Sequence, residues 1–302
     1  MSVVSVFGFI LVLLALGRLL RAREVVPATA PETLHAIALY VCMPAAVLLN
    51  APSLVLERAL LGLVAIPWVL LGATLAVVVP LTRIMRTERA TTACMLLEAP
   101  LGNTAFMGYS LVPVLGGAGA LRYAVVYDQF GSFLMLGTYG MFVIALQSGS
   151  TRPTVRTVAK RILFFPPFVA LVLGLTVVPA HLPVAVAKPL EMLSGSLLPI
   201  VALAVGMQLK LRLPRAHLAP LGFVVVAKLL VLPAIAFALA GLFGLRGEMR
   251  SAAILQSAMP TMMTTGALLS TAGLAPELAA AIVGYTTILS MLTLPVWSYF
   301  LL

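Results

Sequence analysis

Long apolar windows follow one another along almost the whole chain, and they constrain the fold more than any other feature. A hydrocarbon core about 30 Å thick needs about 20 residues of helix. Ten windows of this kind alternate with charged or Pro/Gly-rich joints, at residues 2–20, 33–52, 59–82, 90–112, 119–147, 158–179, 184–208, 216–243, 249–272 and 277–301. Of the 302 residues 62% are hydrophobic and 9% charged, whereas a soluble domain has roughly a quarter charged. The pattern predicts an all-α polytopic membrane protein with ten transmembrane helices.

Basic residues are distributed unevenly over the joints, which predicts the orientation. With the N-terminus outside, thirteen Lys and Arg fall on inside joints and five on outside joints. The inside set is Arg18, Arg21, Arg23, Arg83, Arg86, Arg89, Arg152, Arg156, Lys160, Arg161, Lys210, Arg212 and Arg215; the outside set is Arg58, Arg122, Lys188, Arg246 and Arg250. Inside loops are the basic ones. We therefore expect a multi-pass protein of the cytoplasmic (inner) membrane with both termini outside.

The net charge of +10 is explained by these joints. We accordingly expect the lipid bilayer as a partner and no nucleic acid, while a homodimer stays open. Cys42 and Cys94 lie in apolar stretches, so we expect core residues and neither a disulfide nor a metal pair. No sequence pattern calls for a cofactor or a metal.

The basic joint at 148–161 divides the ten windows into five and five. An odd number of spans per half means that halves sharing one fold, here 1–150 and 151–302, are inverted relative to each other. Prolines support a repeat, because Pro44 and Pro199 in spans 2 and 7 are 155 residues apart, and Pro100 and Pro260 in spans 4 and 9 are 160 apart. Inverted repeats are typical of secondary transporters.

Span 4 contains EAPLGNT and span 9 contains SAMPTMMTTG, which are poor helix formers at the middle of a membrane. Proline removes a backbone donor, and irregular backbone at this depth persists only where protein or a watery cavity covers it. Two such breaks indicate a transporter's binding site, and the helix starts that follow them favour an anion. Two merely kinked helices are the alternative. The candidate substrate-binding residues are Pro100, Gly102, Asn103, Thr104, Pro260, Thr261, Met263 and Thr264.

Three stretches carry a specific resemblance. They are APLGNTAFMGYSLVPVLGG with YDQFGSFLMLGTYG, then LPIVALAVGMQLKLR, then SAMPTMMTTGALLSTAGLAPELAAAIVGYTTILSMLTLPVW. In these stretches, and over its whole length, the chain resembles the auxin efflux carrier family, in its short bacterial type without a long central loop.

The resemblance implies a fold and a substrate class. It implies two inverted five-helix repeats with crossed broken helices at spans 4 and 9, as in the bile-acid:sodium symporter fold. Spans 1, 2, 6 and 7 would form a scaffold, and spans 3–5 and 8–10 a transport domain that moves like an elevator. Plant members carry the indole-acetate anion, and bacterial members are associated with carboxylates such as malonate and malate. The family's Pro-x-x-Asn falls on Pro100 and Asn103. In the second half only Pro260 matches, with Met263 in place of the asparagine.

Three ionisable residues lie inside predicted spans, where such groups are costly. Glu98 precedes the break in span 4 and is a candidate for the crossover or for a packed pocket. Asp128, the only aspartate, is a candidate coupling residue or else a partner of Arg122. Lys228 is near the middle of span 8, where we expect a buried partner such as Glu98 or Asp128.

These features predict a secondary active or potential-driven transporter of a small organic anion. A sodium-coupled symporter of a larger amphipathic anion is the alternative within the class. An embedded enzyme is disfavoured because the chain lacks HExxH and paired intramembrane aspartates, and a channel suits broken inverted repeats less well.

Overall fold

The computed structural model describes residues 3–54, 57–149, 154–209 and 217–301. Within them the chain is helical throughout, and the one pairing of extended backbone is an isolated antiparallel bridge between Gly102 and Thr261. Four of the predicted inside basic residues, Arg152, Lys210, Arg212 and Arg215, lie outside these ranges.

The helices of the first half run to Ser148. They are α1 (Val3–Ala22), α2 (Ala30–Ile37), the π-helical turn η1 (Ala38–Cys42), α3 (Met43–Asn50), the 3-10 turn η2 (Ala51–Ser53), α4 (Ala59–Ile84), α5 (Arg89–Glu98), the π-helical turn η3 (Thr104–Gly108), α6 (Tyr109–Gly116), α7 (Ala120–Tyr127), the π-helical turn η4 (Asp128–Ser132), α8 (Phe133–Met135), the π-helical turn η5 (Leu136–Gly140) and α9 (Met141–Ser148).

The helices of the second half run from Val155 to Tyr299. It consists of α10 (Val155–Leu163), α11 (Pro166–Thr176), α12 (Val184–Gly195), α13 (Leu197–Gln208), α14 (Leu218–Val226), the π-helical turn η7 (Ala227–Val231), α15 (Leu232–Leu242), α16 (Gly247–Ser257), α17 (Met263–Thr271) and α18 (Pro276–Tyr299).

Seven helical segments among the described residues are long and apolar enough to cross a membrane. They are Ser5–Ala22, Ala30–Ser53, Ala59–Ile84, Ala120–Ser148, Val184–Gln208, Leu218–Leu242 and Pro276–Tyr299. They fall in the predicted windows 1, 2, 3, 5, 7, 8 and 10, which confirms a multi-pass, all-helical membrane protein.

The other three windows are built from shorter helices. Windows 4 and 9 are interrupted after Glu98 and after Ser257. Window 6 starts later than predicted, because α11 begins at Pro166. Proline is favourable at this first helical position, since the N–H group that it lacks would have no partner within the helix. The basic residues before it form the separate helix α10.

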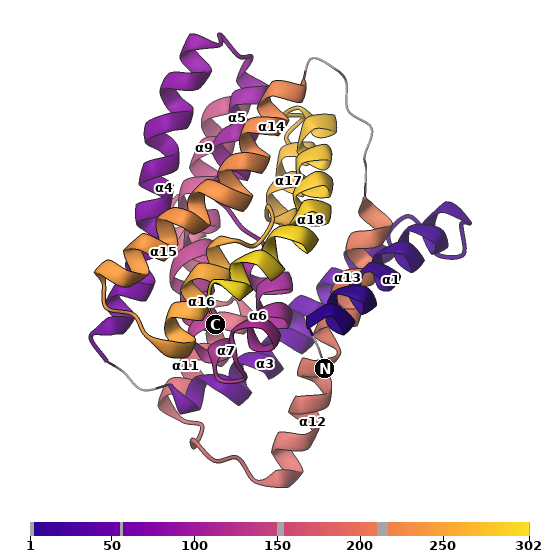
Figure 1. Cartoon of the computed structure of the whole chain (residues 1–302). Coiled ribbons are helices and arrows are strands. Elements are labelled where there is room, and N and C mark those ends of the chain that lie inside the picture. Colours follow the sequence, from indigo (N-terminus) through magenta and orange to yellow (C-terminus); the bar gives the residue numbers. More distant parts are fainter. Residues whose placement is uncertain (1–2, 55–56, 150–153, 210–216, 302) are drawn as a thin grey trace.

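Helices that are distant in sequence pack in two groups. In Figure 1 α4, α5, α9, α14 and α17 stand in the upper part, while α1, α13 and α12 run along the lower right. One apolar cluster surrounds α5 and includes Leu97, Leu221 and Leu278. A larger cluster joins α1, α3, α7, α13 and α16. Cys42 and Cys94 are free and buried in these clusters, as expected.

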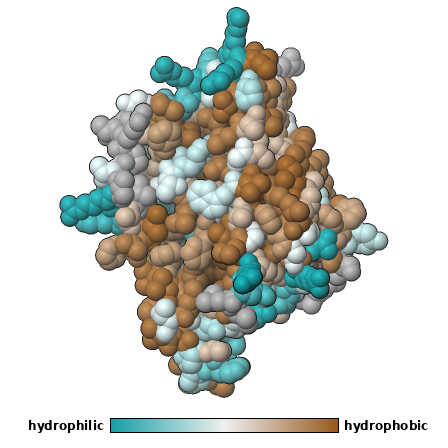
Figure 2. Space-filling view, turned by 90° about the vertical axis from the view of Figure 1, so that its left-hand side faces the viewer, coloured by the Kyte–Doolittle hydropathy of each residue, from teal (hydrophilic) through white to brown (hydrophobic). Residues whose placement is uncertain are grey.

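The outer surface is apolar. Figure 2 shows hydrophobic residues over most of the middle of one face and hydrophilic ones mainly at its margins. Large side chains such as Leu61, Leu242 and Leu292 are largely exposed. In water so much exposed apolar surface would be unusual, so we assign it to contact with lipid.

Candidate functional site

The two interruptions meet and complete each other's hydrogen bonds. Residues 99–103 separate α5 from η3, and residues 258–262 separate α16 from α17. The Asn103 N–H donates to the Pro260 carbonyl at 2.7 Å, and the Met262 N–H donates to the Leu101 carbonyl at 3.0 Å. In Figure 1 α5 and α17 lie above this point and α6 and α16 below it. The pairing explains how non-helical backbone is tolerated here, since each break supplies partners that lipid cannot.

The two hydrogen bonds of this pairing are related by exchange of the two segments. Exchanging the two segments interchanges the two bonds if Asn103 corresponds to Met262 and Leu101 to Pro260. In the bridge itself the counterpart of Asn103 is therefore Met262.

Asn103 is buried and has an unused donor. Its side-chain Oδ1 accepts a hydrogen bond from the Met107 N–H at 3.4 Å, which covers one free N–H at the start of η3. Its Nδ2 is buried and has no partner among the described residues.

Asn103 also lines a small cavity of about 120 Å³. Its lining includes the polar residues Asn103, Asp128 and Thr264, and the apolar residues Leu39, Ala105, Phe106, Phe133, Leu136, Phe165 and Met262. A few polar groups in a mostly apolar hollow are typical of a small-molecule site.

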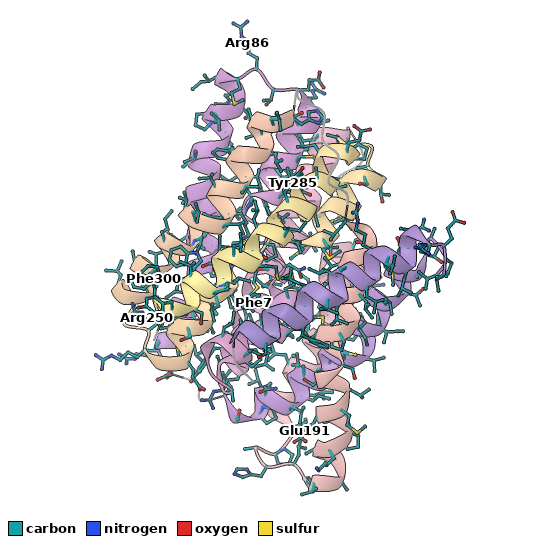
Figure 3. All side chains as sticks on the ribbon, turned by 45° about the vertical axis from the view of Figure 1, so that its right-hand side comes forward. Phe7, Arg86, Glu191, Arg250, Tyr285 and Phe300 are labelled. Carbon is teal, nitrogen blue, oxygen red and sulfur yellow. The ribbon has the colours of Figure 1, made fainter. Side chains whose placement is uncertain are left out.

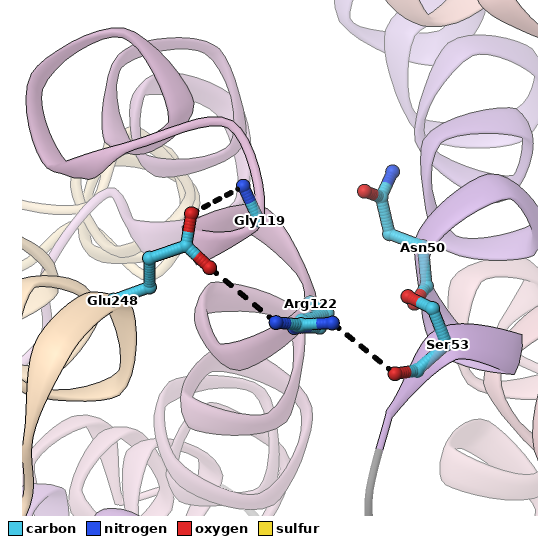
Figure 4. A network of polar contacts seen from close by, with 5 residues as sticks. All are labelled: Asn50, Ser53, Gly119, Arg122 and Glu248. Carbon is cyan, nitrogen blue, oxygen red and sulfur yellow. Dashed lines mark hydrogen bonds and ion pairs between the residues drawn. The ribbon is translucent and has the colours of Figure 1, made fainter.

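Asp128 is held by three neutral donors. Its Oδ1 accepts from the Thr104 hydroxyl at 2.6 Å, and its Oδ2 accepts from Tyr109 at 3.0 Å and Gln129 at 2.9 Å. Arg122 is not its partner, so that expectation was wrong. Arg122 instead forms an ion pair of 3.4 Å with Glu248 and donates to the Ser53 carbonyl, as Figure 4 shows.

Lys228 reaches the first break. Its Nζ donates to the Pro100 carbonyl at 3.2 Å, and it forms no ion pair with Glu98 or Asp128, since Arg122–Glu248 is the one ion pair in the described parts of the chain. The expected acidic partner is therefore replaced by a backbone carbonyl that the break sets free. Gly102 leaves the space, because a Cβ there would lie 2.9 Å from Nζ.

Glu98 ends α5 and is completely buried. Neither carboxyl oxygen has a partner in the described structure. Its backbone carbonyl accepts a hydrogen bond from the Thr261 hydroxyl at 3.0 Å, which ties the end of α5 to the bridge.

The predicted binding residues thus divide by position. Asn103 and Thr264 line the small cavity. Other predicted residues lie at the crossing, which is the place where the two helix breaks pair. There they act through polar groups or, at Gly102, through the lack of a side chain; they are Pro100, Gly102, Thr104, Pro260 and Thr261. Met263 lies elsewhere, in a second cavity of about 370 Å³.

That second cavity, here called the vestibule, lies where several helix ends meet. It is lined by Arg21, Ala28, Pro31, Glu32, Met207, Gln208, Met263, Gly266, Ala267, Ser270, Ala280 and Val283. These residues come from the end of α1, the start of α2, the end of α13 and the facing surfaces of α17 and α18. All of these helix ends lie on the side predicted to be inside.

Sequence reasoning missed the π-helical turns. Thr104 begins η3, Asp128 begins η4, and Lys228 lies in η7. Each turn carries a polar residue toward the crossing, and π-helical turns are frequent at functional sites. The aromatic wall of Phe133 and Phe165 was also missed, since nothing local distinguishes it from lipid-facing phenylalanine.

Similarity to known proteins agrees with this geometry. The model of the membrane transport protein family, which comprises the auxin efflux carriers, matches residues 2–298. The chain belongs to this family. An uncharacterised transporter of Methanothermobacter thermautotrophicus is 30% identical over 203 residues, or 67% of this chain and 66% of that one. Another, of Methanocaldococcus jannaschii, is 25% identical over 97% of both chains. Membership confirms the resemblance seen in spans 4, 7, 9 and 10, and it indicates a transporter and not an enzyme.

Proposed function

We propose that the protein is a secondary carrier that moves a small organic anion, a carboxylate, across the cytoplasmic membrane. The observation that carries the proposal is the unused donor of Asn103, a residue that lines a cavity beside two paired helix breaks. The amide offers a donor to a carboxylate, and the helix starts at η3 and α17 favour negative charge. A cavity of about 120 Å³ suits a small anion better than a large amphipathic one.

The halves 1–150 and 151–302 are proposed as inverted repeats. Their helix contacts support this, because they occur in corresponding pairs. The contact of α1 with α13 corresponds to that of α11 with α3, and the contact of α4 with α5 to that of α15 with α16. The contact of α18 with α5 corresponds to that of α7 with α16. In each case the second contact is obtained from the first by replacing a span of one half with the equivalent span of the other half. The crossing bonds, which interchange under the same operation, give further support.

With this arrangement we propose an elevator-type movement. Spans 1, 2, 6 and 7 would be the scaffold, and spans 3–5 and 8–10 would carry the crossing as one body. The bridge binds spans 4 and 9 to each other, and Lys228 attaches span 8 to the same point. The bound anion would therefore travel with the crossing. The vestibule would lie on the inner side of the membrane.

Counterflow in proteoliposomes tests the proposal. Vesicles loaded with malonate or malate should take up the same labelled anion in exchange, and Asn103→Ala should weaken apparent affinity by about 5- to 150-fold, the equivalent of about 1–3 kcal/mol for a lost buried hydrogen bond. Asn50→Ala is the matched control, because the Asn50 amide donates only to Ala46 of its own helix. A folded Asn103→Ala protein with wild-type affinity would move the site elsewhere.

A further inference from the structure

The side chain of Glu98 has no role in the contacts described so far. It is 0% exposed, and neither oxygen finds a hydrogen-bond donor within the described residues. Its helix packs against α4, α9, α14, α17 and α18. The apolar cluster around this helix includes Leu97, Leu269 and Ile282.

A single glycine separates this carboxyl group from the vestibule. Gly266 of α17 lines the vestibule, and a Cβ placed on Gly266 would lie 3.3 Å from Glu98 Oε1. The same Cβ would lie 3.0 Å from Val283 Cγ2, so no bulkier residue fits without movement. The carboxyl therefore lies next to a residue of the cavity wall that has no side chain.

Charged and titratable neighbours do not compensate a negative charge on Glu98. Those on its own helix and on the helices packed against it are Arg83, Arg89, Cys94, Glu277, Tyr285 and Tyr299. None forms an ion pair with Glu98. Tyr139 donates to the Leu96 carbonyl, and Lys228 is bound to Pro100.

A buried carboxylate without a partner costs so much free energy that such groups are normally neutralised. A metal cation would need a shell of several oxygen ligands, and within the described residues no group of three or more His, Cys, Asp or Glu side chains comes together. A proton needs only the carboxyl itself.

We propose that Glu98 is a proton-binding site that exchanges with the vestibule past Gly266 and couples proton movement to anion transport. The coupling rests on the proposed function, whereas the proton site does not. On release, the O–H bond of the acid breaks, the carboxyl keeps the electron pair, and a vestibule water becomes hydronium. The bond from Thr261 to the Glu98 carbonyl links this site to the crossing.

Infrared spectroscopy of the purified full-length protein tests the proton site without any substrate. We expect a C=O stretch of a protonated carboxylic acid that is absent in Glu98→Gln and retained in Asp128→Asn. In heavy water this band should shift rapidly in the wild type and several-fold more slowly in Gly266→Ala. No such band in the wild type, or one that survives in Glu98→Gln, overturns the proposal. If Glu98→Gln does not fold, the test is whether the wild type shows the band and whether its shift in heavy water is slower in Gly266→Ala.

Transport assays test the coupling. With malonate or malate, a pH gradient with the outside more acidic should drive accumulation of the anion inside vesicles that contain the wild type. Glu98→Gln should keep counterflow but reach only the equilibrium ratio of about one. Wild-type accumulation by Glu98→Gln, or accumulation driven by a sodium gradient alone, overturns it. Absence of counterflow in the wild type would instead reject these anions as substrates and leave the infrared result standing.

Discussion

At the scale of single residues, the crossing depends on polar groups whose partners come from other helices. Gln256 is completely buried, and its Nε2 donates to the carbonyls of Thr104 at 3.1 Å and Ala124 at 2.9 Å. Gly108 makes room for this side chain, since a Cβ there would overlap Gln256 Oε1. The start of η3 is thereby bound to α16 through Gln256, and Thr104 is bound to η4 through Asp128.

Asp128 and Glu98 should respond differently to neutralisation. In Asp128→Asn an amide NH₂ replaces one acceptor, so at least one donor among Thr104, Tyr109 and Gln129 loses its partner, at a cost of about 1–3 kcal/mol. We expect lower uptake at every pH with an unchanged pH profile. If the anion enters with a proton, wild-type uptake rises as external pH falls, and only Glu98→Gln should flatten this rise.

Uptake measured across pH for both variants checks this expectation. Glu277→Gln is the matched control, because Glu277 is an exposed acid at the start of α18 and its loss should leave rate and profile unchanged. A flattened profile in Asp128→Asn and a normal one in Glu98→Gln would exchange the roles of the two acids.

The sequence identified the polar residues of the site but not their partners. Asn103 was predictable because it follows a proline inside an apolar window. The partner of Lys228 was not, since the Pro100 carbonyl becomes an acceptor only when the helix breaks. Likewise, the three donors to Asp128 come together only through η3 and η4, and no local propensity distinguishes a π-helical turn from an α-helix.

At the scale of helices, glycine decides how closely α1 and α13 approach. A Cβ on Gly17 would overlap the Leu203 carbonyl oxygen, and a Cβ on Gly206 would overlap that of Leu14. Small residues at helix contacts are the usual basis of packing in membranes, where water exclusion gives no driving force. This contact is therefore expected to be a main source of stability for the proposed scaffold.

Gly206→Ala should accordingly destabilise the protein. The added methyl group meets backbone and cannot be accommodated by rotating a side chain, so we expect a loss of about 1–3 kcal/mol, as for an overpacked core. Thermal unfolding in detergent measures it. Gly8→Ala in α1 is the matched control, with no atom within 4 Å of the new Cβ, and it should leave stability unchanged or raise it by up to about 1 kcal/mol. Equal melting of Gly206→Ala and wild type would show that α1 and α13 separate readily.

The helix prediction succeeded where length alone decides and was less accurate where proline intervenes. Windows such as 59–82 appear as one continuous helix, Ala59–Ile84. Window 158–179 does not, because Pro166 and Pro167 begin a new helix. The crossing of the two broken windows follows from pairing between residues about 160 positions apart, which no local pattern encodes.

At the scale of the whole molecule, the predicted orientation assigns Arg86 and Glu191 to opposite sides of the membrane. Figure 3 shows Arg86, a predicted inside residue, at one extremity and Glu191, next to the predicted outside joint at Lys188, at the other. The vestibule is lined by Arg21 near the end of α1. Both the direction of proton entry and the access of the anion therefore depend on which end faces the cytoplasm.

Thiol labelling in intact cells tests this orientation. Cysteines at Arg86 and Arg156 should resist a membrane-impermeant reagent until the cells are opened, while one at Arg246 should react at once, because inside loops carry the basic residues. The native Cys42 and Cys94 are buried, so we expect little labelling of the protein without an introduced cysteine, which serves as the background control. Reversed labelling would place the vestibule outside, so that Glu98 would exchange protons with the exterior in this conformation. The infrared band would be unaffected, but the direction of the pH gradient that loads the acid from the vestibule would reverse.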